Sequence, residues 1–180
     1  TLIPGNIYGP SDHFECSRSH VVAAVLRRAV VSQLLGRETF SVWGNGSATR
    51  DFVYVDDVAR TIAQAVTSAH RFSGDVFNIG SGSETSVRQL ADLVAETVGG
   101  GIEPEFVEEE LVGYTHRVLS NELARNVLGY QPKISLQDGL FETLAWVRRE
   151  GLDRSWLDAE VQESGQPLQL FGGSGLRRAA

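Results

Sequence analysis

Residues 39–70 read TFSVWGNGSATRDFVYVDDVARTIAQAVTSAH, and this stretch decides the fold class. The apolar residues of 39–43 predict a strand, and Gly44-Asn45-Gly46 is typical of a turn. Residues 52–55 predict a second extended segment, which leads into a helix that begins at Asp56 or Asp57 and ends near residue 70. Because strand-like and helix-like periodicities follow each other so closely, the sequence indicates an α/β protein.

The same alternation continues on both sides of this stretch. Upstream, Ser19 is a candidate N-cap for a helix that runs through residue 35 and ends at Gly36. Downstream, residues 75–79 and 103–107 predict two more strands.

Three serines mark the starts of further helices. Ser86-x-x-Gln89 is a capping box for a helix that runs through residue 98 and ends at a run of glycines. Ser120 and Ser135 are candidate caps of two more helices. We therefore expect one structured part over residues 1–151, followed by a short helix and a flexible tail over residues 152–180.

Composition and charge exclude several classes of function. The 180 residues are 42% hydrophobic and carry 16 Lys and Arg against 23 Asp and Glu, a formal net charge of −7. This charge disfavours nucleic acid as a partner, and every apolar run is shorter than the roughly 20 residues that a membrane span needs. The single cysteine, Cys16, excludes an internal disulfide and fits a reducing compartment, so we expect an inert thiol in a cytoplasmic protein.

Two segments place polar residues next to predicted strands, where α/β proteins bind ligands. The first is Pro4-Gly5-Asn6-Ile7-Tyr8-Gly9-Pro10, and the chain continues from it to His20. The second places Arg50 in a polar loop between two apolar strands, from which a guanidinium can bind a phosphate through two parallel hydrogen bonds.

The order of five segments resembles the carboxyl-terminal half of the extended short-chain dehydrogenase/reductase family. This family comprises NAD(P)-dependent nucleotide-sugar epimerases, dehydratases and reductases. The resemblance covers about residues 1–150, and the context of Asp12, His13 and His20 looks most like the GDP-L-fucose synthase branch. The five segments are NIYGP (6–10), GNGSATRDFVYVDD (44–57), FNIGSG (77–82), LGYQP (128–132) and LQDGL (136–140).

The resemblance implies a division of labour. An amino-terminal Rossmann half would hold NADP or NAD and supply a Tyr-x-x-x-Lys pair, while this part of the chain binds the nucleotide sugar. The sequence contains neither that pair nor a Gly-x-x-Gly-x-x-Gly turn, and it begins without Met, so we expect a fragment whose dinucleotide-binding half is missing. We expect a GDP-sugar as ligand and a homodimeric parent enzyme. The alternatives are another sugar epimerase or dehydratase, a non-catalytic sugar-nucleotide-binding module, or an inactive truncated product.

The resemblance also assigns roles to three residues. Asn6 would bind the nucleotide sugar, Arg50 its diphosphate, and His20 would act as an acid or base in epimerisation beside a keto group. Each residue has a structural alternative. Asn6 can be a turn residue, Arg50 an ion-pair partner of Asp51 or Asp56, and His20 an exposed residue at a helix start.

The sequence departs from the family at one ligand-binding position. Many relatives carry a second phosphate-binding Arg at the position that here is Leu111 or Val112. His116 and Arg117 are the nearby candidates to replace it.

The remaining polar groups favour structural roles. Asp56 and Asp57 are expected to cap the helix that follows residue 55 and to interact favourably with its dipole. No two histidines have the spacing of metal ligands. The loop Gly80-Ser81-Gly82 departs from a dinucleotide fingerprint, because Thr85 occupies the position of its third glycine. We therefore predict neither a metal site nor a cofactor site.

Overall fold

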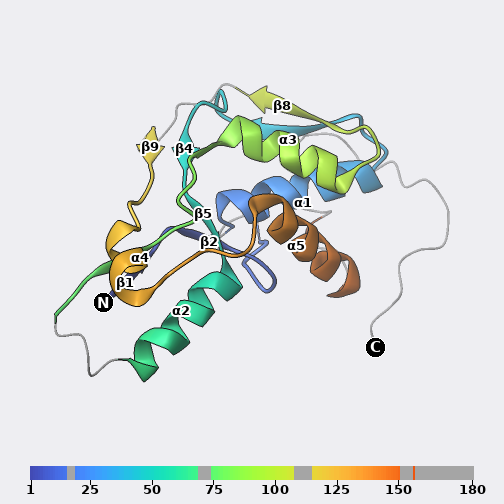
Figure 1. Cartoon of the computed structure of the whole chain (residues 1–180). Helices are drawn as coiled ribbons and strands as arrows, with labels where there is room; N and C mark the ends of the chain where they lie inside the picture. Colours follow the sequence, from blue (N-terminus) through green and yellow to red (C-terminus); the bar gives the residue numbers. More distant parts are fainter. Residues whose placement is uncertain (16–18, 69–73, 108–114, 151–155, 157–180) are drawn as a thin grey trace.

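The computed structural model describes residues 1–15, 19–68, 74–107, 115–150 and 156. Strands and helices alternate along these residues, so the expected α/β class is confirmed (Figure 1). In chain order the elements are β1 (Leu2–Pro4), β2 (Asn6–Tyr8), α1 (Val21–Leu34), β3 (Thr39–Trp43), β4 (Thr49–Arg50), β5 (Phe52–Tyr54), α2 (Val55–Thr67), β6 (Phe77–Ile79), β7 (Thr85–Ser86), α3 (Val87–Val98), β8 (Glu103–Val107), β9 (His116–Arg117), α4 (Glu122–Leu128) and α5 (Leu136–Glu150).

Most of the strands pair in parallel with strands that are distant in sequence. β1 pairs with β6, β2 with β5, and β3 with β8, all in parallel. β4 lies between β7, to which it is antiparallel, and β9, to which it is parallel. Parallel pairs need crossover connections, which the helices between these strands supply.

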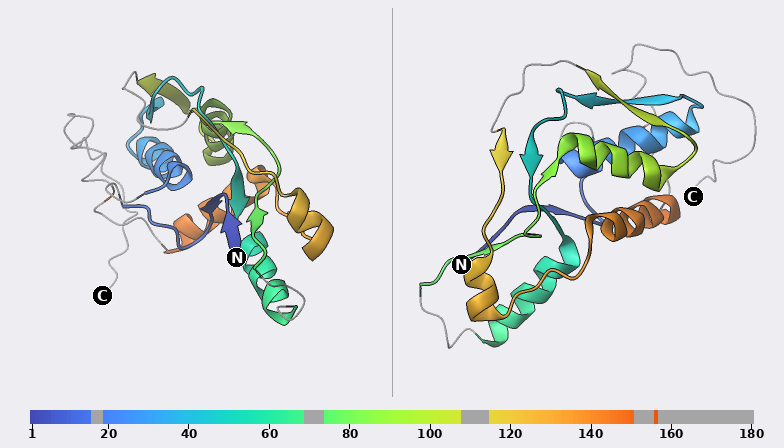
Figure 2. Two further views of the ribbon diagram at one scale, coloured as in Figure 1. Left: turned by 90° about the vertical axis from the view of Figure 1, so that its left-hand side faces the viewer. Right: turned by 45° about the horizontal axis from the view of Figure 1, so that its top comes forward.

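Two hydrophobic clusters hold these elements together. In the larger cluster, α1 and α3 pack beside the β3–β8 pair, and α5 lies against α3 (Figure 2). The smaller cluster joins β5 and β6 to α2 and α4. Buried members of the larger cluster include Leu26, Ala29, Phe40, Val42, Leu90, Val94, Leu140 and Leu144, and those of the smaller cluster include Val53, Phe77, Ile79 and Ala124.

Two of the four predicted serine caps are correct. Ser86 and Gln89 form the predicted capping box, and the Asp138 N–H donates to the Ser135 hydroxyl at the start of α5. The other two predictions are wrong by one residue. His20 is the N-cap of α1 in place of Ser19, and Asn121 is that of α4 in place of Ser120, with no side-chain cap at either. The backbone at His20 is still extended, so the first helical residue is Val21.

The end of the chain is described at Trp156 alone. Trp156 is buried and stacks on Phe14, with 5.1 Å between the ring centroids. The predicted boundary at 151 and the helix and tail over residues 152–180 otherwise lie outside the described residues. Among the residues that the structure describes, no helix has both the length and the apolar character to cross a bilayer.

Candidate functional site

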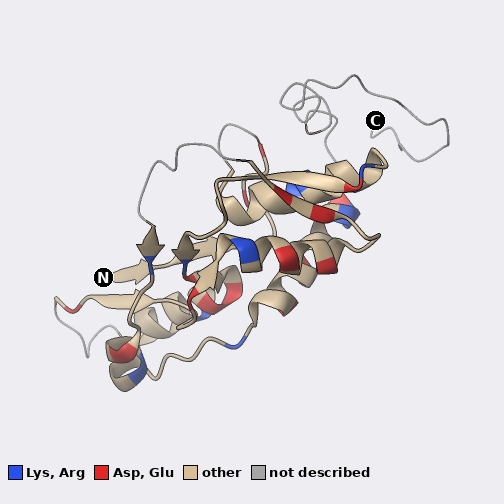
Figure 3. Cartoon of the chain, turned by 90° about the horizontal axis from the view of Figure 1, so that it is seen from above, with Lys and Arg blue, Asp and Glu red and all other residues tan. Residues whose placement is uncertain are grey.

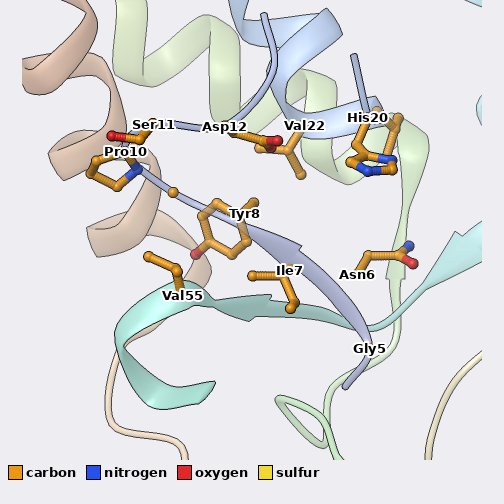
Figure 4. Close-up of a pocket in the computed structure, with 12 residues that line it drawn as sticks. Gly5, Asn6, Ile7, Tyr8, Pro10, Ser11, Asp12, His20, Val22 and Val55 are labelled. Carbon is orange, nitrogen blue, oxygen red and sulfur yellow. The ribbon is translucent and has the colours of Figure 1, made fainter. Parts of the chain in front are cut away.

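A pocket of about 440 Å³ lies between β2 and the start of α1. The first polar segment of the sequence forms one side of it, and the amino-terminal end of α1 forms the other. The ring of Tyr8 lies in the middle, with Asn6 and His20 on one side and Pro10 and Ser11 on the other (Figure 4). The pocket therefore brings together two of the three predicted site residues, Asn6 and His20.

Strand pairing fixes the position of Asn6. Asn6 is opposite Phe52 in the β2–β5 pair, and its N–H donates to the Asp51 carbonyl at 2.8 Å. The alternative reading of Asn6 as a turn residue is therefore wrong, since it lies in a strand. His20 is exposed at the start of α1, and its carbonyl accepts the Ala24 N–H.

Tyr8 is a wall of the pocket that α5 holds in place. Its hydroxyl donates to the carbonyls of Ser135 and Leu136, and burial raises the pKa of Tyr8 above its ordinary value. Gly139 faces the ring so closely that a Cβ there would be 2.1 Å from the Tyr8 hydroxyl oxygen. A glycine at this point of α5 is therefore what allows the helix to pack on the pocket wall.

Asp12 is a pocket residue to which the sequence assigned no role. It lines the pocket, and its Oδ1 accepts the His13 N–H at 2.7 Å. Its Oδ2 is buried and has no hydrogen-bond partner among the described residues. A carboxylate oxygen in this position can accept a hydrogen bond from a ligand hydroxyl.

Arg50 lies outside the pocket lining, on β4. It is opposite Arg117 in the parallel β4–β9 pair, and the basic positions of these strands lie side by side (Figure 3). Only Asp51 separates Arg50 from Phe52, the residue opposite Asn6. The guanidinium of Arg50 donates to the Thr49 carbonyl at 2.7 Å.

His116, the residue before Arg117 in β9, bonds to Thr49 and does not lie beside Arg50. Thr49 and His116 are opposite each other one position earlier, and a bond of 2.9 Å joins Thr49 Oγ1 to His116 Nδ1. Because side chains alternate along a strand, Arg50 and Arg117 point to the other face. Of the two candidates that the sequence offers, His116 and Arg117, Arg117 is thus the one beside Arg50. Leu111 and Val112 lie outside the described residues.

Asp57 does not cap α2 as predicted. The helix begins at Val55 with Tyr54 as its N-cap. The Asp57 carboxylate is buried, accepts the N–H groups of Lys133 and Ile134 at 3.0–3.1 Å, and forms an ion pair with Arg60. It therefore holds the segment that leads into α5. Asp56, in contrast, is exposed in the first helical turn, where its charge suits the dipole.

The loop Gly80-Ser81-Gly82 does not fit a dinucleotide pyrophosphate. The Ser81 N–H and hydroxyl both donate to Asp51 Oδ1 at 2.7 Å, and the Ser83 N–H donates to the Ser81 hydroxyl. These donors are thus occupied within the protein, and a buried carboxylate lies where a phosphate would have to approach. No group of three or more potential metal ligands occurs within the described ranges.

Three tyrosines with raised pKa values make the stability of the fold depend on alkaline pH. Burial, together with the charge of Asp51, raises the pKa of Tyr130 to about 12, and burial also raises the pKa values of Tyr8 and Tyr54. An unfolded tyrosine loses its proton near pH 10, whereas folded Tyr130 keeps it to about pH 12. The unfolded state then binds fewer protons, so stability falls as pH rises.

We expect the melting temperature to change little between pH 8 and 9 and to fall between about pH 10 and 12. Thermal denaturation followed by circular dichroism across this range measures the effect. Tyr130→Phe should make the fall less steep, because it removes one of the titrating groups. A slope that is the same in this variant and in the wild type would contradict the assignment.

Comparisons with known proteins identify related sequences. Residues 1–80 match the model of the NAD dependent epimerase/dehydratase family. GDP-L-fucose synthase 1 of Arabidopsis thaliana is 39% identical over 155 residues, which are 84% of this chain and 46% of that protein. UDP-glucose 4-epimerase of Mycolicibacterium smegmatis is 38% identical over 151 residues, or 83% and 45% of the two chains. This chain thus spans a little under half the length of these relatives.

Solved structures give the same result. UDP-glucose 4-epimerase of Thermotoga maritima, solved with UDP-glucose, superimposes with a TM-score of 0.70 at 34% identity, covering 83% of this chain and 45% of that one. A GDP-L-fucose synthetase from Naegleria fowleri has a TM-score of 0.73 at 22% identity, covering 82% and 45%, and supports the fold. The fold is therefore that of Rossmann-type epimerases and reductases. Specifically, the chain belongs to the NAD-dependent epimerase/dehydratase family.

Proposed function

We propose that this chain is the nucleotide-sugar-binding part of an NAD(P)-dependent epimerase/reductase that resembles GDP-L-fucose synthase. The observation that carries the proposal is the pairing of Arg50 with Arg117, next to the strand that pairs with Asn6. Two guanidinium groups on one face of neighbouring strands suit a diphosphate, which can accept two parallel hydrogen bonds from each.

The pocket beside this pair of cations supplies the groups that a sugar needs. The side chain of Asn6 can both donate and accept hydrogen bonds, and the free Oδ2 of Asp12 can accept one from a hydroxyl. The aromatic ring of Tyr8 gives the pocket an apolar wall. We assign the diphosphate to Arg50 and Arg117 and the sugar to the pocket.

His20 is assigned the proton transfer. A hydrogen on a carbon beside a keto group is acidic enough to be exchanged when a base stands on one face of the sugar and an acid on the other. A neutral imidazole can accept a proton and an imidazolium can donate one, so histidine can serve as either group. His20 lines the same pocket as Asn6 and is exposed, so it can reach a bound ligand.

We assign NADP or NAD to another part of the complete enzyme, which we propose to be a homodimer. The cofactor supplies hydride transfer when bound. The donors of the loop at Gly80-Ser81-Gly82 already serve Asp51, which supports this assignment.

We favour a GDP-sugar as the ligand. Relatives named for GDP-sugars and for UDP-sugars have nearly equal identities of 39% and 38%, so overall similarity does not choose between them. The sequence context of Asp12 and His20 favours the GDP-L-fucose synthase type.

Calorimetric titration tests the proposal. We expect the chain to bind a GDP-sugar more tightly than a UDP-sugar, and guanosine at least about tenfold more weakly, because it lacks the diphosphate that contacts the two arginines. Guanosine that binds as tightly as the GDP-sugar would contradict the proposal. A UDP-sugar that binds more tightly would instead assign the chain to the UDP-sugar epimerases.

A sugar-nucleotide-binding module without catalysis is the second candidate. The lack of a Tyr-x-x-x-Lys pair in the 180 residues favours it. Incubation of the protein with a 4-keto GDP-sugar in deuterium oxide distinguishes the two. An epimerase incorporates deuterium beside the keto group and loses this exchange in His20→Asn, whereas a module binds the sugar and shows no exchange in either form.

A further inference from the structure

Asp51 joins two segments that are far from it in the sequence. Its main-chain carbonyl accepts the N–H of Asn6 at 2.8 Å, which contributes to the contact between β5 and β2. Its Oδ1 accepts both the N–H and the hydroxyl of Ser81 at 2.7 Å each. The side chain is buried, at 1% exposure, so water does not compete for these bonds.

The loop that Asp51 holds is itself fixed on its other side. The carbonyl of Gly80 accepts hydrogen bonds from the Tyr130 hydroxyl at 2.7 Å and the Asn121 amide at 3.1 Å. A Cβ at residue 80 would be 2.1 Å from Asp51 Oδ2, so only glycine allows the carboxylate to come this close. The carboxylate is thus bonded to a loop with two further attachments to the fold.

Arg50 lies in a very short strand that runs directly into Asp51. β4 consists of Thr49 and Arg50, and its neighbours β7 and β9 have two residues each. The Thr49 N–H donates to the Thr115 carbonyl and the Val87 N–H to the Ala48 carbonyl, both at 2.9 Å, and β4 then continues through Asp51 into β5. A shift of Asp51 would move Arg50 relative to Asn6.

We propose that Asp51 is a positioning residue for ligand binding. Its bonds to Ser81 fix the backbone of Arg50 relative to the pocket, so that the guanidinium meets the diphosphate while the sugar reaches Asn6. Groups that bind a ligand must be held within about 0.5 Å of the productive geometry, and this is the function of Asp51. The inference rests on the proposed function of Arg50.

Titration of variants with a GDP-sugar and a UDP-sugar, together with thermal denaturation, tests it. We expect Asp51→Ala to weaken binding of the preferred nucleotide sugar about tenfold, which corresponds to about 1.4 kcal/mol. Ser81→Ala keeps the backbone bond and should cost about threefold. Asp51→Asn retains an oxygen acceptor for both bonds, so it should recover to within about threefold of the wild type.

Gln33→Ala is the control for stability. The Gln33 amide donates to the carbonyls of Gly99 and Val98 at 2.8 and 3.3 Å, and none of these residues lines the pocket. Its loss should lower the melting temperature and change affinity by less than about twofold. If Asp51→Ala lowers the melting temperature while affinity stays at the wild-type value, Asp51 is only structural and the inference is overturned.

Coupling to Arg50 provides the decisive comparison. In an Arg50→Ala background, Asp51→Ala should change affinity by less than about twofold further, because the group that it positions is gone, while its effect on melting remains. An additional tenfold loss in that background would overturn the inference and leave the role of Arg50 intact. A wild-type chain that binds neither nucleotide sugar would overturn the proposed function, and this inference with it.

Discussion

Replacing Arg50 with alanine should weaken binding of the nucleotide sugar about ten- to hundredfold. The variant loses a charge-assisted, bidentate contact of about 1.5–3 kcal/mol. Arg50→Lys should recover part of this loss, since it restores the charge without the planar pair of donors. Calorimetric titration measures the affinity of both variants. The salt concentration is kept fixed, because screening weakens the contact between arginine and phosphate as salt rises.

The melting temperature of Arg50→Ala distinguishes a ligand-binding role of Arg50 from a structural role. Arg50 is half-buried and donates to the Thr49 carbonyl, so its removal should change the melting temperature by only a few degrees. Arg149→Ala, which removes an equal charge from the exposed end of α5, should leave affinity unchanged. Unchanged affinity together with a lowered melting temperature in Arg50→Ala would show that Arg50 serves the fold and does not bind ligand.

Asp57→Ala should be the most destabilising single substitution that we describe. It leaves the partly buried N–H groups of Lys133 and Ile134 without their acceptor and Arg60 without its partner. We expect a loss of about 3 kcal/mol and a fall in melting temperature of roughly 6–12 °C.

Asp56→Ala provides the matched comparison. Both acids lie in the first turn of α2, so a pure dipole effect would make the two substitutions equal. The structure predicts that Asp56→Ala costs less than about 0.5 kcal/mol, because this side chain is exposed. Equal losses in the two variants would contradict the role that we assign to Asp57.

The longer elements of the fold could be predicted from local sequence. α3 was located because Ser86 and Gln89 form a capping box and an apolar stripe follows. β3 and β8 were located because apolar residues recur over five positions in each. Such signals depend on neighbours within a few residues, and they do not depend on what the element packs against.

The short strands could not be predicted in this way. β4, β7 and β9 have two residues each, too few to show a period, and they form because distant segments pair with them. The pairing of Arg50 with Arg117 joins positions 67 residues apart (117 − 50). The local sequence therefore offers Arg117 only as one of two candidates for a second phosphate-binding residue, and it does not predict that Arg117 lies beside Arg50.

The roles of the buried carboxylates could not be predicted, for the same reason. Asp57 has the sequence context of a capping residue, yet its partners at 133 and 134 are more than 70 residues away. The local context of Asp51 suggests only an ion pair with Arg50, whereas its carboxylate bonds to Ser81. Only the arrangement of the strands reveals which distant donors each carboxylate accepts.

A crystal structure of the chain with a bound GDP-sugar tests the central claim most directly. We expect the diphosphate oxygens at about 2.7–2.9 Å from the guanidinium nitrogens of Arg50, with Arg117 on the same phosphates and the sugar beside Asn6 and His20. Density for the diphosphate at the loop Gly80-Ser81-Gly82, or anywhere else away from both arginines, would contradict the account.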